Sequence, residues 1–125
     1  MNKKEIKLLD TQILLLIISI ITIIINILLT YNQRLNLENK TTIFSSKTTK
    51  KITRYNRLIV LFLSIAFLYI NYEFKNITKQ KNEELTQSNL QITASYLSVI
   101  AALIAYYVTK LNTPGDISDI ENPII

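Results

Sequence analysis

The sequence contains no histidine, cysteine or tryptophan, and only one glycine and two prolines among its 125 residues. Without histidine or cysteine, the chain lacks the usual zinc ligands, a thiol nucleophile and the base of a Ser-His-Asp triad. A single glycine cannot supply a phosphate-binding loop or a dinucleotide-binding fingerprint. We therefore expect no catalytic, cofactor-binding or metal-ligating residues, and we expect that the protein is not an enzyme.

Charge is also missing from three long stretches of the chain, although its net charge is +5. The uncharged runs cover residues 13–31, 58–72 and 90–108. As helices they would be roughly 28, 22 and 28 Å long, and a bilayer's hydrocarbon core is about 30 Å thick. A soluble bundle would carry charges along each helix's solvent face. The pattern therefore predicts an all-α protein with three transmembrane spans.

Two of these runs have other interpretations. The first could be a signal peptide because lysines precede it, but it is longer than the apolar region of a usual signal peptide and no small-x-small cleavage site follows. The second is short enough for a buried helix of a soluble protein, so two spans are the fallback. To span a membrane, it needs Arg57 and Lys75 to extend their charged ends to the two interfaces.

The spacing of these runs divides the chain into a single membrane domain with six segments. We expect a transmembrane helix at 13–31, a basic loop at 32–56 leading into the second helix, a transmembrane helix at 57–73, a polar loop at 74–89, a transmembrane helix at 90–109 and an acidic disordered tail at 110–125. Ser45 and Ser46 precede a lysine-rich stretch, which predicts an N-cap for a helix that begins in water and continues through the second span.

The basic residues give a prediction of orientation. Three spans put six Lys and Arg on the side of the N-terminus and second loop, and eight on the side of the first loop and the C-terminus. By this narrow margin the positive-inside rule favours an outside N-terminus and a cytoplasmic C-terminus.

Five basic residues gather within eleven positions before the second span: Lys47, Lys50, Lys51, Arg54 and Arg57. Such a cluster is typical of anionic-lipid binding, but it also sets topology, and we favour the topological interpretation. Nucleic-acid binding is not expected, because Tyr55 is the one aromatic residue near the cluster.

Uncharged polar and small residues lie on one face of the first run and on one face of the third, within an arc of about 80° in each case. Small and hydroxyl side chains let transmembrane helices approach closely, and Asn26 and Asn71 could form hydrogen bonds to neighbouring helices. A pore is the less favoured interpretation, because the runs contain no acid, base or glycine break. Tyr96 lies deep in the third run and needs a hydroxyl or carbonyl partner. The predicted helix-packing residues are Ser19, Thr22, Asn26, Ser64, Asn71, Ser98, Ala102 and Ala105.

Three short segments carry a resemblance: Leu29-Thr30-Tyr31-Asn32, Ile70-Asn71-Tyr72-Glu73 and Leu90-Gln91-Ile92-Thr93-Ala94-Ser95. In these the chain resembles small, functionally uncharacterised integral membrane proteins of low-GC Gram-positive bacteria. The resemblance implies a bacterial cytoplasmic membrane and no particular activity.

Three functions fit the sequence. The leading one is a non-enzymatic membrane protein that acts through helix–helix association, as a homo-oligomer or within a larger membrane complex. A holin-like or channel-forming protein would suit the three spans, but not the acidic tail or the long first loop. The third is an immunity protein against a membrane-active peptide. All three place the chain in a lipid bilayer.

Overall fold

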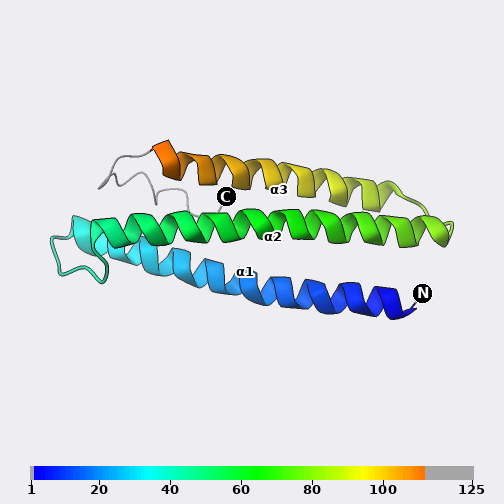
Figure 1. Ribbon diagram of the computed structural model, residues 1–125, viewed down its shortest axis with the longest axis horizontal. Helices are drawn as coiled ribbons and strands as arrows, with labels where there is room; N and C mark the ends of the chain where they lie inside the picture. The colour runs from blue at the N-terminus through cyan, green and yellow to red at the C-terminus, as the bar shows by residue number, and fades with distance from the viewer. Residues whose placement is uncertain (1, 112–125) are drawn as a thin grey trace.

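The computed structural model describes residues 2–111. They form three helices, α1 (Asn2–Leu37), α2 (Ser46–Gln80) and α3 (Thr86–Leu111), joined by short connections. Successive helices run in opposite directions, with α2 between α1 and α3 (Figure 1). Each helix is long and apolar enough to cross a membrane. The predicted all-α fold with three membrane-crossing helices is thus confirmed for this part of the chain.

The connections are shorter than the sequence pattern indicated. Residues 32–37 continue α1 and residues 46–56 form the first three turns of α2, so the expected basic loop at 32–56 shrinks to 38–45. The expected polar loop at 74–89 likewise shrinks to 81–85. Charge keeps a segment out of hydrocarbon, but Lys, Arg, Glu and Gln are good helix formers, so the helices continue past the apolar runs. Of the expected acidic tail, Lys110 and Leu111 belong to α3, and residues 112–125 lie outside the described part.

Asparagine and serine side chains define where the helices begin and end. Ser45 is the N-cap of α2, as predicted, because its Oγ accepts a hydrogen bond of 3.2 Å from the amide of Thr48. Asn39 follows the end of α1 and Asn82 the end of α2, each with a φ of 58°. This left-handed conformation usually belongs to glycine, and asparagine tolerates it best among the other residues.

The core lies along α2, which packs more extensively against α3 than against α1. Five of its seven buried residues repeat every seven positions, the spacing of helices that pack with left-handed crossing. These positions are Thr49, Asn56, Leu63, Ile70 and Ile77. Ala102 and Ala105 are the buried alanines of α3, and such small residues let two backbones approach closely. The bulky isoleucines and leucines of α1 do not allow the same approach.

The apolar runs of α1 and α3 are not level with each other. Asn56 of α2 contacts Thr22, the centre of the run at 13–31. Its neighbour Arg57 contacts Ala105, six residues beyond the centre of the run at 90–108. Six residues of helix correspond to about 9 Å, so Asn56 and Arg57 of α2 lie beside the middle of one apolar run and near the end of the other.

Candidate functional site

An open groove of about 740 Å³ runs between α1 and α2. Its apolar lining includes Leu63 and Phe67 from α2. Polar residues line it as well, and they are Ser19, Thr22, Asn26, Thr30 and Ser64, together with Tyr31 and the charged Arg34. The polar stripe of α1 therefore faces a groove, and most Ile and Leu residues on the other sides of this helix are exposed, whereas Leu29 is buried.

A second groove of about 450 Å³ is lined by residues of all three helices. Its polar lining comes from Gln12 of α1, from Ser64 and Asn71 of α2, and from Gln91, Ser95 and Ser98 of α3. The two grooves share Ser64 and Phe67, so they adjoin. We call the polar residues of both grooves the polar face.

The polar face contains six of the eight predicted packing residues. The other two, Ala102 and Ala105, are buried, with exposures of 1% and 8%. Ala105 lies in the contact between α2 and α3, where its carbonyl accepts a hydrogen bond from Arg57. The structure thus separates the predicted residues into an open face and a part of the packed core.

Asn26 and Asn71 form hydrogen bonds to neighbouring helices within the chain. The Oδ1 of Asn26 accepts a bond of 2.8 Å from the Nδ2 of Asn56, which also donates to the carbonyl of Thr22 at 3.2 Å. The Nδ2 of Asn71 donates to the Oγ of Ser95 on α3. These two predicted residues therefore join α2 to α1 and to α3.

The hydroxyl groups of the polar face bond within their own helices. The Oγ atoms of Ser19, Ser64 and Ser98 donate to the carbonyl four residues earlier, at 2.9, 2.9 and 3.0 Å. Thr22 donates to the carbonyl of Ser19 at 2.7 Å. Because their donors are satisfied locally, these residues can lie in an apolar medium without a second chain, and their oxygens keep a free lone pair.

Two buried asparagines were missed by the sequence analysis because they fall in the segment expected to be a loop. Asn56 is 2% exposed, and its Oδ1 has no hydrogen-bond partner among residues 2–111. Asn32 is 5% exposed and holds the connection between α1 and α2. It donates to the carbonyl of Phe44 and to the Oγ1 of Thr49, and it accepts from the amide of Phe44 at 2.8 Å. The seven-residue spacing of Thr49, Asn56 and Leu63 was the signal available for Asn56.

Arg57 does not extend its charge to the membrane surface as expected. Its side chain is buried, with 6% of the residue exposed, and Nη1 donates to the carbonyl of Ala105 at 3.0 Å. Arg54 reaches the carbonyl of Thr109 with Nη2 at 3.4 Å. Two cations thus lie at the C-terminal end of α3, where the helix dipole favours positive charge.

Tyr96, expected to need a polar partner, finds it on α2. Its hydroxyl lies 2.7 Å from that of Tyr72, and the two rings meet edge to face with centroids 6.2 Å apart. This contact and the Asn71–Ser95 bond lie side by side between α2 and α3. Ser95 and Tyr96 of α3 are therefore paired with α2.

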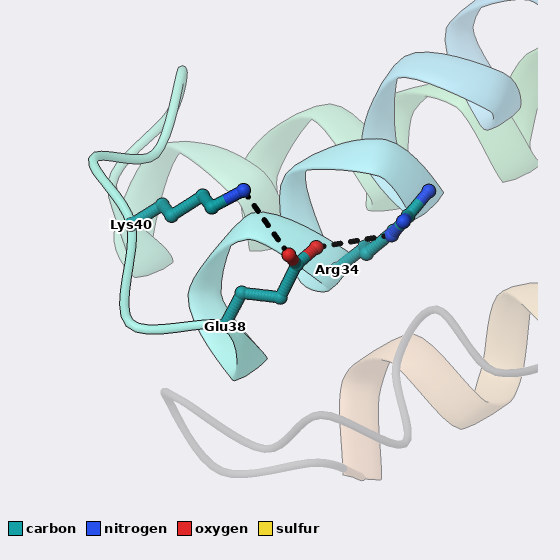
Figure 2. Close-up of polar contacts among 3 residues, drawn as sticks. All are labelled: Arg34, Glu38 and Lys40. Atoms are coloured by element: carbon teal, nitrogen blue, oxygen red, sulfur yellow. Dashed lines mark hydrogen bonds and ion pairs between the residues drawn. The ribbon is translucent and has the colours of Figure 1, made fainter.

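Ion pairs lie at both ends of the helices. At one end, Lys4 bonds to Glu73 at 3.0 Å and Lys81 to Glu5 at 2.8 Å, so α1 is joined to the C-terminal end of α2. The hydrogen bond that Lys81 donates to Glu5 raises the pKa of Lys81 above its ordinary value. At the opposite end, Figure 2 shows Glu38 between two cations, Arg34 at 3.0 Å and Lys40 at 3.2 Å.

Comparisons with known protein families, with curated proteins and with solved structures find no significant match to this chain. Within the described part of the chain, no group of three or more acidic, histidine or cysteine residues could hold a metal ion.

Proposed function

We propose that this protein is a small, non-enzymatic, multi-pass membrane protein that acts through helix–helix association at its polar face. The partner is a second copy of the chain or a helix of a larger membrane complex. One observation carries the proposal: polar residues of all three helices line adjoining open grooves at the depth of the apolar runs.

Packing within the chain leaves room for such a partner. In the most apolar 18-residue window of α1, 11% of the residues are buried, although this window has a mean hydropathy of 3.0. Lipid tails cannot form hydrogen bonds with Thr30, Gln91 or the free lone pairs of the serines. A further helix could bond to them while it fills the grooves, and such contacts drive association in membranes.

The absence of cysteine makes self-association simple to measure. A single Lys40→Cys substitution in the first connection can be labelled with donor or acceptor dyes, and energy transfer in liposomes reports association. We expect Thr30→Leu and Ser98→Leu to lower the association constant by about three-fold for each polar contact removed.

Thr93→Leu is the matched control for Ser98→Leu. Both residues are exposed on α3, and both hydroxyls donate to the carbonyl four residues earlier at 3.0 Å, but Thr93 does not line either groove. Equal effects of the two substitutions would contradict the proposal. It would also fail if the chain stayed monomeric and photo-crosslinkers at Thr30 and Ser98 captured no protein in native membranes.

The same face could instead line a water-filled path if several copies assembled. This second candidate predicts that induced expression in bacteria depolarises the membrane within minutes, as seen with a potential-sensitive dye. The association proposal predicts no depolarisation. Of residues 2–111, Arg34 is the one charged residue that lines either groove, and it is bonded to Glu38; the other polar groups are uncharged, which favours association over conduction.

We further propose that the protein lies in a bacterial cytoplasmic membrane with the first connection inside. Among residues 2–111, the end with this connection has eight basic residues and one acidic residue, and the opposite end has six and five. Cysteine at Lys40 should react with an impermeant thiol reagent after lysis only, and cysteine at Asn82 in intact cells. The reverse result would overturn this orientation.

A further inference from the structure

The first turns of α2 form a strongly basic surface that the proposed association does not use. With about 100° of rotation per residue, all five cations of this segment fall within an arc of about 120°. They are Lys47, Lys50, Lys51, Arg54 and Arg57. We call this surface the basic face. The geometry points to a binding site for the headgroup of an anionic phospholipid on the basic face.

Three cations of the basic face are available to a ligand. Lys47, Lys51 and Arg54 are exposed and follow one another at the i, i+4 and i+7 spacing of a single helix side. Arg54 uses Nη2 for the carbonyl of Thr109, which fixes its guanidinium beside the end of α3. Glu38, the one acidic residue at this end among those described, is bonded to Arg34 of α1 and to Lys40 of the connection between α1 and α2.

The position of the basic face along the helices identifies the ligand as a lipid. Asn32 of α1 contacts Thr49, so the uncharged stretch of α1, which ends at Gln33, reaches past the level of Lys51. Arg54 contacts Thr109, the last uncharged residue of α3. Lys51 and Arg54 therefore lie where α3 passes from its uncharged residues to its charged end, and beside uncharged residues of α1, so lipid can reach them with its phosphate at this level.

The surrounding residues have the chemistry of this depth. Tyr31 and Tyr107 are exposed at the same ends of α1 and α3, and tyrosine rings prefer the membrane interface. Lys110 lies over the ring of Tyr106, 5.0 Å from its centroid, and adds a further cation beside Arg54. Ammonium and guanidinium groups in this layer bind phosphate oxygens by charge-assisted hydrogen bonds.

The absence of tryptophan allows a direct measurement. Tyr55 is 57% exposed and lies one turn after Lys51, so Tyr55→Trp places a unique fluorophore beside the basic face. In nanodiscs, quenching by brominated phosphatidylglycerol and by brominated phosphatidylcholine gives the relative binding constant of the two lipids. We expect preference for phosphatidylglycerol, lowered about five-fold for each cation replaced by glutamine. High salt should weaken the preference.

Two variants and a matched control test the site. Lys47→Gln/Lys51→Gln keeps the contact of Arg54 with α3, and the triple variant adds Arg54→Gln. Lys3→Gln/Lys7→Gln/Lys79→Gln removes three exposed charges from the opposite end and should leave the preference unchanged. Both leaflets of a nanodisc have the same composition, so a purely topological role of the cations would give no preference at all.

Several results would overturn the assignment. They are equal quenching by the two lipids, an equal loss in the control variant, or full competition by millimolar inorganic phosphate, which would indicate a site for a soluble anion. A preference that appears after Asp116→Asn/Asp119→Asn/Glu121→Gln, and not before, would assign the basic face to the chain's own acidic residues. The site requires membrane insertion but not the polar face, so it can fail while the association proposal holds.

Discussion

Asn56 provides the most direct test of how α1 is held to α2. It donates two hydrogen bonds to α1, 2.8 Å to the Oδ1 of Asn26 and 3.2 Å to the carbonyl of Thr22. Because that carbonyl can only accept, the amide nitrogen of Asn56 must face it, which determines the orientation of the side chain. A substitution at this position therefore removes a defined pair of contacts between two helices.

The expected magnitude follows from the number of bonds. Hydrogen bonds between transmembrane helices contribute about 0.6 kcal/mol on average and up to about 1.7 kcal/mol. Asn26→Ala removes one of the two hydrogen bonds that Asn56 donates, and Asn56→Ala removes both. Asn56→Ala should therefore lower the free energy of unfolding by about 1–3 kcal/mol. The lower part of this range is expected, because the substitution also removes the buried Oδ1 of Asn56, which lacks a partner.

A double-mutant cycle isolates the bond between the two asparagines. Unfolding of Asn26→Ala, Asn56→Ala and the double variant would be followed by circular dichroism in mixed micelles with increasing SDS. We expect a coupling free energy of about 0.6–1.7 kcal/mol. Asn56→Asp should lower the free energy of unfolding more than Asn56→Ala does, since the Asp carboxylate would face the carbonyl oxygen of Thr22 and repel it. The control cycle combines Asn56→Ala with Thr93→Ala on the exposed side of α3. A coupling between the asparagines no larger than in this control would refute the reasoning.

Three further perturbations have defined outcomes. Asn32→Ala should lower the stability of the connection between α1 and α2 by about 1–3 kcal/mol, because it removes three hydrogen bonds of one side chain. Faster amide hydrogen exchange at residues 38–45 would report this loss. Arg57→Ala should lower the free energy of unfolding in the same SDS titration by about 1.5–3 kcal/mol, since the charge-assisted hydrogen bond to α3 is removed. The Lys81–Glu5 contact should persist at neutral pH and weaken above about pH 10.5, because the pKa of Lys81 is raised; energy transfer between labels on α1 and α2 would report the change.

Much of the fold follows from the sequence because lipid excludes charge. The runs at 13–31, 58–72 and 90–108 predict three helices through the summed transfer free energy of their own residues, a local property. The Ser45 cap is also local, since the serine bonds to an amide three residues later. The Ser45 cap indicated the early start of α2, but the sequence pattern did not predict that α1 continues past residue 31 and α2 past residue 73, because charged segments are compatible with both helix and loop.

The candidate site was predicted in part. Rotation about a helix axis groups Ser19, Thr22 and Asn26 on one face, but it cannot tell whether that face is packed or open. The structure leaves Ser98 on an open groove and buries Ala102, one turn later, against α2. The difference arises because α1 and α3 flank α2 with little contact between them, which the sequence pattern does not contain.

The sequence by itself therefore determined that the chain forms three apolar helices with polar faces and one strongly basic segment. The tertiary structure decided which polar groups find partners: Asn26 bonds to Asn56, and Arg57 turns to the carbonyl of Ala105. It also decided which residues of neighbouring helices lie at the same height, and it places the basic face beside uncharged residues of α1. Hydropathy is summed residue by residue, but a hydrogen bond between helices depends on which helices adjoin and at what height.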